Sequence, residues 1–325
     1  MNRREILAFL GTITALPPSA LAQQPNAARR LGVLSVTSAD NAIGHERNGV
    51  LVEALAALGW KEQDNLIIDW RSGSGDRARI ARLAEEMIAL KPDVLFAVGT
   101  PSVEELRSRT TTTPIVFAIV TDPVSQGFVE NLARPGGNMT GFTDYDGPLA
   151  GKWLEMLMQI SPPVRRVYVV YNPATAPFAP LMLGTVEEAG RALGVAVEPA
   201  PVHDAASIAA LASRKDGGLL VLPDFFTMIH RTELLTAVTE GRVPAVFWSR
   251  TFVDEGGLMS YSTDTAEQLR RAASYIDRIL RGARAADLPV QNPTKFELVI
   301  NLKAARALGV TIPSGLLALA HDVIE

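Results

Sequence analysis

Apolar and polar positions follow two alternating patterns from residue 31 onward: short continuous apolar runs, and longer stretches with helical spacing. Four runs are rich in branched side chains and bounded by turn formers, and they predict buried strands at 31–36, 66–70, 94–98 and 115–120. Between the second and third runs, an amphipathic stripe predicts a helix through Ile80, Leu83, Ala84, Met87 and Ile88. Strands that alternate with helices in this way indicate a parallel sheet covered on both faces.

The same series restarts after residue 150. Its apolar runs predict strands at 167–171, 195–199, 219–222 and 245–248, with helical stripes between them. Two such series of similar length predict two similar lobes. The predicted fold class is therefore α/β, with two doubly wound parallel-sheet lobes.

The last part of the chain does not start a third series. It holds two strand patterns, at 258–262 and 296–300, and a long amphipathic helix that ends at Gly282. These elements most simply complete the earlier sheets, which requires the chain to cross between the lobes more than once. Linkers rich in glycine and proline flank the runs at 139–143 and 258–262, which we expect to be hinge strands.

The composition narrows the function classes. The chain has 325 residues, with 31 Lys and Arg against 35 Asp and Glu, and its net charge of −4 indicates no basic surface for nucleic acid. It has no cysteine, and its four histidines lack the spacing of metal ligands. Nucleophile-elbow and phosphate-loop motifs are also absent. We therefore predict no catalytic residue, no metal site and no cofactor.

The first 22 residues have the pattern of a signal peptide. Asn2-Arg3-Arg4 supplies a positive start, an apolar stretch follows at 6–16, and Ala20-Leu21-Ala22 offers the small residues that signal peptidase reads. The apolar stretch is shorter than the about 20 residues that a membrane-spanning helix needs. We expect cleavage after Ala22 and a periplasmic product. The paired arginines fit either the twin-arginine route or an ordinary Sec signal.

Ligands in open parallel sheets bind beyond the carboxyl ends of the strands, and this rule selects the candidate site. Both series place small hydroxyl groups, carboxylates and backbone amides in those loops, with aromatic residues nearby. A small solute enclosed by apolar walls and held by a few polar groups fits this inventory. The candidate ligand-binding residues are Ser38, Asn41, Thr100, Thr121, Asp122, Asn172, Asp224, Ser249 and Tyr261.

Several of these residues have a structural alternative. Asp122 and Asp224 are either ligand contacts or helix caps, and Thr100, which precedes Pro101, fits an N-cap. Arg250 either clamps a ligand carboxylate or links two loops. The two aspartates also leave open a periplasmic acid–base enzyme, which requires a raised pKa on one of the two carboxyl groups.

Four segments resemble those of one family. They read TDPV at 121–124, LARPGGNMTG at 132–141, EGGLMSY at 255–261 and FELVINLK at 296–303. With the export signal and the paired α/β series, they look like the solute-binding family of ABC transporters that includes tryptophan- and aromatic-amino-acid-binding members. That family has the type I periplasmic binding protein fold. The similarity runs from about residue 30 to the C-terminus.

The resemblance implies chain crossings near residues 143, 260 and 290. One lobe then comprises 30–143 plus 260–290 and the other 144–259 plus 291–325, with the solute trapped at the hinge. The implied function is an exported monomer that captures an amino-acid-like, aromatic or amide solute and delivers it to an ABC permease in the inner membrane. A ligand-sensing partner of a membrane receptor is the alternative that the sequence leaves open.

Overall fold

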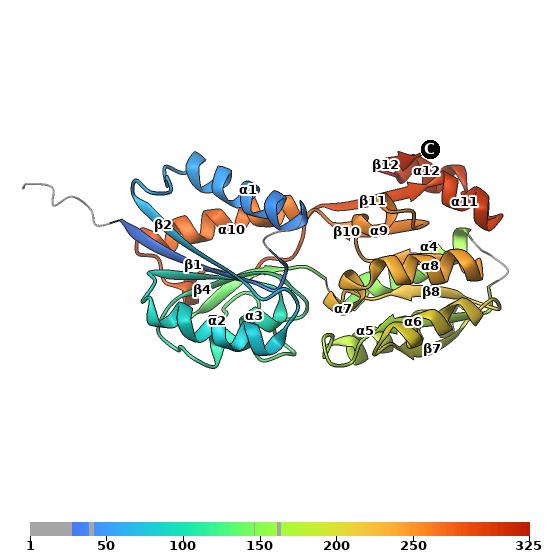
Figure 1. Cartoon of the computed structure of the whole chain (residues 1–325), viewed down its shortest axis with the longest axis horizontal. Helices are drawn as coiled ribbons and strands as arrows, with labels where there is room; N and C mark the ends of the chain where they lie inside the picture. Colours follow the sequence, from blue (N-terminus) through green and yellow to red (C-terminus); the bar gives the residue numbers. More distant parts are fainter. Residues whose placement is uncertain (1–27, 39–41, 146, 161–163) are drawn as a thin grey trace, which may run out of the picture.

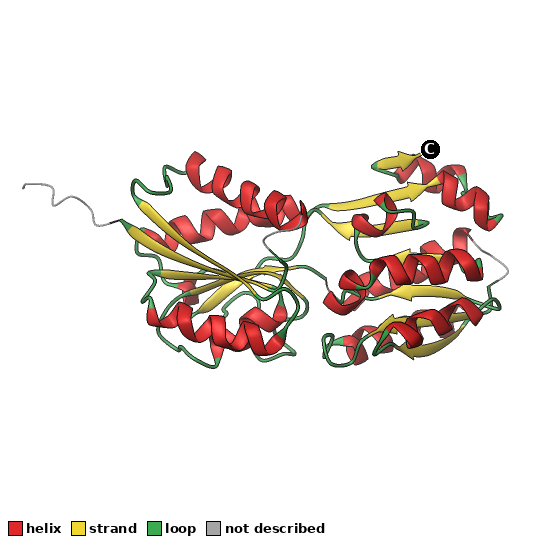
Figure 2. Ribbon diagram, in the orientation of Figure 1, coloured by secondary structure: helices red, strands yellow, loops and turns green. Residues whose placement is uncertain are grey.

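The computed structural model describes residues 28–38, 42–145, 147–160 and 164–325, and these form two α/β lobes that lie side by side (Figure 1). Each lobe is built on its own sheet, as the strands in Figure 2 show. Within the described ranges, no helix is both long and apolar enough to cross a bilayer. The predicted signal peptide, residues 1–22, lies outside them.

The described residues of the first lobe form a five-stranded sheet with the order β2-β1-β3-β4-β5. Every neighbouring pair in it is parallel. Its strands are Arg29–Ser35 (β1), Leu66–Ser72 (β2), Val94–Val98 (β3), Ile115–Val120 (β4) and Met139–Thr143 (β5). The apolar runs predicted the first four strands, because buried parallel strands carry continuous apolar sequence, and the expected hinge strand at 139–143 is β5.

Helices cover both faces of this sheet. Side chains such as Leu31, Val33 and Phe96 pack with one helix pair, and Leu34 and Leu95 pack with the other, because neighbouring residues of a strand point to opposite faces. The first face carries Ala42–Ala57 (α1) and Thr265–Leu280 (α10), and the second carries Arg77–Ala89 (α2) and Thr100–Arg107 (α3).

The described residues of the second lobe form a seven-stranded sheet with the order β12-β11-β10-β9-β8-β6-β7. It is parallel except that β10 and β11 are antiparallel. Its strands are Arg166–Tyr171 (β6), Ala196–Pro201 (β7), Gly218–Val221 (β8), Ala245–Phe247 (β9), Met259–Thr263 (β10), Phe296–Asn301 (β11) and Asp322–Ile324 (β12). The helices are Gly147–Ile160 (α4), Ala179–Leu193 (α5), Ala205–Ala209 (α6), Phe225–Ile229 (α7), Arg231–Gly241 (α8), Arg250–Asp254 (α9), Leu302–Leu308 (α11) and Ser314–Leu319 (α12).

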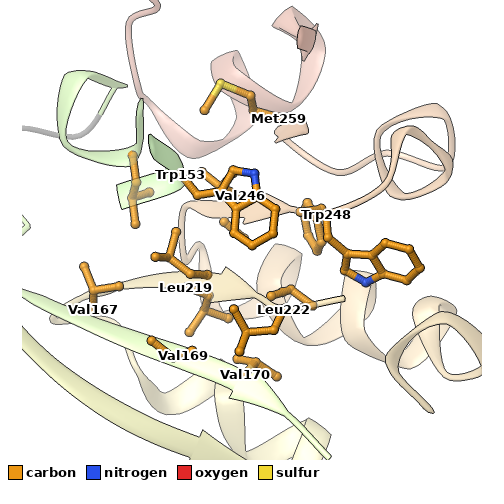
Figure 3. Close-up of a cluster of buried hydrophobic side chains, with 14 of the residues drawn as sticks. Trp153, Val167, Val169, Val170, Leu219, Leu222, Val246, Trp248 and Met259 are labelled. Carbon is orange, nitrogen blue, oxygen red and sulfur yellow. The ribbon is translucent and has the colours of Figure 1, made fainter. Parts of the chain in front are cut away.

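One hydrophobic cluster forms the core of the second lobe. Trp153 of α4 is fully buried among branched residues of β6, β8 and β9, and Trp248 lies at the edge of the same cluster (Figure 3). The Trp153 indole still finds a partner, since its Nε1–H donates to the carbonyl of Tyr261 at 2.7 Å. This bond ties α4 to β10.

The two sheets share one strand order. In the first lobe it is β2-β1-β3-β4-β5, and in the second β7-β6-β8-β9-β10, followed by β11 and β12. The prediction that the last part of the chain completes the earlier sheets is thus confirmed for β10 and β11. The apolar pattern did not predict β12, a three-residue edge strand whose side chains are only partly buried.

The chain changes lobe three times. It leaves the first sheet after β5, returns after β10 to form α10, and leaves again between Gln291, which bridges to Phe142 of the first sheet, and β11. The boundary predicted at 260 needs correction, because residues 260–263 of β10 pair with β9 and β11 in the second sheet. Apolar alternation shows that a strand is buried but not which sheet it joins.

Candidate functional site

The carboxyl ends of the parallel strands in the two lobes face each other (Figure 2). Three cavities lie at or near these ends. The first, here called the interlobe cavity, is lined by both lobes and has a volume of about 20 Å³. Its polar and aromatic lining includes Thr100, Thr121, Asp144, Asp224, Phe225 and Trp248.

The interlobe cavity has room for about one water molecule and not for a larger solute, since one water needs roughly 10–15 Å³ of such space. Direct contacts between the lobes explain its size. A Cβ atom on Gly99 would lie 3.0 Å from the ring of Phe225, and Arg77 donates to the carbonyl of Ala174 at 3.3 Å. The structure therefore holds the lobes against each other, and a solute enters this space only when they separate.

A larger cavity of about 590 Å³ adjoins the crossings of the chain, and we call it the hinge cavity. It shares Asp144 and Trp248 with the interlobe cavity. Charged groups of both signs line it: Glu46, Arg47, Arg250, Asp254, Asp264, Arg270, Lys295 and Glu297. Within the described ranges, no group of His, Asp and Glu side chains is arranged to hold a metal ion.

Asp144 is a buried carboxylate at the first crossing. It accepts hydrogen bonds from the Thr263 hydroxyl and from Nε2 of Gln268, the latter at 2.9 Å. Desolvation raises the pKa of the Asp144 carboxyl, while these hydrogen bonds and the Arg47 guanidinium oppose the rise. Because Thr263 and Gln268 flank the second crossing, Asp144 connects two of the three crossings.

Arg47 extends from α1 toward this carboxylate. Its guanidinium donates to Oγ1 of Thr37 at 3.2 Å and is attracted by Asp144. Desolvation lowers the pKa of Arg47, yet an arginine stays protonated at neutral pH. The neighbouring Tyr145 donates its hydroxyl to the carbonyl of Trp248 at 2.5 Å, which joins the first crossing to the second lobe.

Asp224 lines the interlobe cavity and also caps a helix. Its carboxylate accepts from the backbone N–H groups of Phe226 at 2.9 Å and Asn172 at 2.7 Å, and from the Thr175 hydroxyl at 2.5 Å. Burial raises the pKa of the Asp224 carboxyl, and these hydrogen bonds oppose the rise. The cap predicted for this residue is confirmed, and ligand contact stays a prediction that its place in the cavity wall permits.

Asp122 occupies a turn beside the cavity. Its carboxylate accepts from the N–H of Ser125 at 3.1 Å, and its φ of +41° is unusual for a residue other than glycine. Ile119, three residues earlier, has φ +58° at an irregularity in the pairing of β4 with β5. A β-branched residue rarely adopts this conformation, and such strain concentrates at functional sites.

Thr100 is not the cap that the sequence predicts. Gly99 occupies the N-cap position with φ +87°, and Thr100 is the first residue of α3, with Pro101 in the first turn. The helix start is therefore displaced by one residue. This displacement leaves Thr100 buried in the wall of the interlobe cavity beside Thr121.

The other predicted residues lie in different surroundings. Ser249 caps α9 and lines the hinge cavity, and Ser38 lines a cavity inside the first lobe. Asn172 accepts from the N–H of Ala174 in a turn and lines none of the three cavities. Tyr261 stacks on the ring of Phe296 within the second lobe. Asn41 lies outside the described residues.

Arg250 has a structural role. Its guanidinium bonds to Asp322 of β12 at 2.6 Å and to Asp254 at 3.2 Å, so it links α9 to the C-terminal strand.

The sequence did not predict three residues of the site, Arg47, Asp144 and Tyr145. Asp144 and Tyr145 directly follow β5, so the strand-end rule that selected the other candidates also applies to them.

The sequence matches a family model described as ABC transporter substrate binding protein over residues 31–324. A curated relative, the tyrosine-binding protein of Clostridioides difficile, is 25% identical over 260 residues, which cover 79% of this chain and 74% of that protein.

Two solved structures are similar over most of the chain. A conserved domain protein from Vibrio cholerae O1 biovar El Tor has a TM-score of 0.84 and 28% identity, covering 91% of this chain and 99% of its own. An ABC domain from Streptococcus pneumoniae, solved in complex with L-Trp, has a TM-score of 0.84 and 26% identity, covering 92% and 100%. These matches confirm the predicted fold class.

Proposed function

Because the chain belongs to the family of ABC transporter substrate-binding proteins, we propose that it captures a small aromatic or amino-acid-like solute between its lobes and delivers it to an inner-membrane permease. The family is one of solute-binding proteins and not of enzymes. Relatives described as a tyrosine-binding protein and as a complex with L-Trp support the choice of solute class.

The observation that carries this proposal is the composition of the interlobe cavity. Thr100 and Thr121 come from strand ends of the first lobe, and Asp224, Phe225 and Trp248 come from the second. A solute that enters between the separated lobes contacts both sets of side chains only when the lobes close around it, and these contacts stabilise the closed, solute-bound state. The crossings near Asp144 absorb the rotation.

The proposed contacts are the predicted residues that line this junction: Thr100, Thr121, Asp224 and Ser249. Hydrogen bonds from Thr175, Phe226 and Asn172 already hold the Asp224 carboxylate, which supports a positioning role over proton transfer. We assign no catalytic role, no nucleic acid partner and a monomeric state. Residues 1–22 direct export to the periplasm.

A thermal-shift screen tests the function. The mature protein is heated with L-tryptophan, L-tyrosine and 3-phenylpropanoate, each at saturating concentration. A solute present at 100 times its Kd adds about 2.7 kcal/mol to the free energy of unfolding. We expect at least one of the three to raise the melting temperature by several degrees. No shift with any of them contradicts the proposed solute class.

A further inference from the structure

A third cavity lies within the first lobe, over the carboxyl ends of β1, β2 and β3. We call it the first-lobe cavity, and its volume is about 200 Å³. In the strand order β2-β1-β3-β4-β5, the chain runs from β1 to β2 on one side of β1 and then adds β3 and β4 on the other side, so the strand order reverses between β1 and β3. Such a reversal opens a crevice at the carboxyl ends of the strands, where open α/β sheets bind ligands.

The register of the strands builds an apolar floor for this cavity. Val33 of β1 pairs with Trp70 of β2 on one side and with Phe96 of β3 on the other. The three side chains therefore form one row on the face that α1 covers, and Leu51 of α1 lies above them. A cavity of about 150 Å³ lined by apolar side chains is enough to bind benzene. The first-lobe cavity therefore has room for one ring and a small substituent.

The polar lining of the cavity is positive. Arg47, Arg71 and Arg79 line it, and none of the described residues in its wall is an aspartate or glutamate. Arg71 pairs with Glu86 at 3.5 Å, outside the cavity wall. Within the described part of the chain, the Arg79 guanidinium forms no salt bridge. The charges of this cavity thus differ from those of the hinge cavity, which holds both signs.

We infer that the first-lobe cavity is a second solute site, separate from the interlobe cavity, and that it binds an aromatic monocarboxylate that carries no ammonium group. Guanidinium groups bind carboxylates with charge-assisted, often paired hydrogen bonds, and Arg79 and Arg47 supply them. Trp70 and Phe96 contact the ring. None of the described side chains in the cavity wall is a carboxylate that could pair with an α-ammonium group, and burying an unpaired charge is unfavourable.

This cavity adjoins the junction of the lobes. Arg47 and Leu269 line both the first-lobe cavity and the hinge cavity. A solute bound against Arg47 therefore touches the side chain that faces Asp144 at the first crossing. A solute in the first-lobe cavity is therefore in contact, through Arg47, with the crossings about which the lobes close.

Calorimetry of the mature protein with three matched probes tests the inference. 3-Phenylpropanoate has the ring and the carboxylate, 3-phenylpropanamide lacks the charge, and L-phenylalanine adds an ammonium group. We expect 3-phenylpropanoate to bind at least tenfold more tightly than either of the others. Arg79→Gln should weaken its binding roughly 10- to 100-fold, as expected for loss of a hydrogen bond to a charged group. The affinity for the amide should stay unchanged.

Arg82→Gln is the matched control, because Arg82 is an exposed arginine of the same helix that does not line the cavity. It should leave the Kd of 3-phenylpropanoate within twofold of the wild type. L-Phenylalanine binding more tightly than 3-phenylpropanoate, no binding of 3-phenylpropanoate, or equal effects of the two substitutions each overturns the inference. The proposed function survives these outcomes if L-tryptophan or L-tyrosine still raises the melting temperature, and it fails if no probe does.

Discussion

Gln268 donates a hydrogen bond from Nε2 to the carboxylate of Asp144 at 2.9 Å, across 124 residues of sequence. The same amide accepts a bond of 3.4 Å from the N–H of Ile119, a residue with strained backbone in the wall of the interlobe cavity. One buried side chain therefore joins the first crossing, the start of α10 and the end of β4. Movement at the hinge has to preserve or exchange these bonds.

The network predicts an unusual pH dependence of stability. Burial raises the pKa of Asp144, so the folded protein binds this proton more tightly than the unfolded chain does. The contribution of Asp144 to the free energy of unfolding should therefore be greatest below the ordinary aspartate pKa of about 3.9 and fall as pH rises through the raised value. Urea unfolding of the wild type and of Asp144→Asn across pH 3.5–7 measures the difference.

The wild type should lose stability relative to Asp144→Asn as pH rises over that window. Asp93→Asn is the control, because Asp93 pairs with Arg29 at 2.7 Å on the surface. A free energy of unfolding of the wild type that stays constant or rises relative to that of Asp144→Asn over this window would contradict the raised pKa.

Gly99→Ala should weaken solute binding. The added Cβ would lie 2.8 Å from Val36 and 3.0 Å from the Phe225 ring of the other lobe, so it opposes closure in addition to straining the backbone at φ +87°. Gly59→Ala introduces similar strain at φ +94° with nothing within 4 Å. We expect both variants to lose stability and Gly99→Ala alone to raise the Kd, by about tenfold if closure loses about 1.4 kcal/mol. Equal Kd values for the two variants would show that the lobes do not close at this contact.

Substitution of Asp224 should change the Kd of the solute, and substitution of Asp122 should not. Asp224→Asn removes the charge of a group that lines the interlobe cavity, and its amide nitrogen cannot accept one of the two backbone N–H bonds, so we expect a higher Kd and a loss of about 1–3 kcal/mol of stability. Asp122→Asn changes a turn residue that lines none of the three cavities, and the Kd should stay within twofold. Calorimetry and urea unfolding of both variants give the two quantities. A larger Kd change for Asp122→Asn would reverse the assignment.

Mass spectrometry of the exported protein tests the signal peptide. We expect the mature chain to begin at Gln23, after cleavage behind Ala22. Residues 1–22 still attached to periplasmic protein would contradict this prediction.

The apolar pattern predicted much of the fold, because the burial of a strand is visible in the residues of that strand alone. Strands such as β1, β3, β4, β6 and β8 are short apolar runs that are largely buried, so their own sequence indicates their burial. The pattern could not place β10 in the second sheet, because membership depends on pairing with β9 and β11. It also gave Thr100 as a cap where Gly99 serves, since a glycine with positive φ leaves no side-chain signal.

The sequence predicted the part of the candidate site that lies at strand ends. The strand-end rule selected Thr100, Thr121 and Asp224, which meet in one cavity wall. Arg47 lies in the middle of α1, and it reaches the junction only because α10 and the crossings fold back beside that helix. No property of the residues around Arg47 in the sequence indicates this neighbourhood.

Closure of the two lobes around a solute is the central claim, and small-angle scattering tests it most directly. The radius of gyration of the mature protein is measured alone and with the probe, among L-tryptophan, L-tyrosine and 3-phenylpropanoate, that gives the largest thermal shift. A smaller radius with the probe bound is the result expected, because the solute stabilises contacts such as that of Gly99 with Phe225. An unchanged or larger radius, with binding confirmed by calorimetry in the same buffer, would contradict capture by closure.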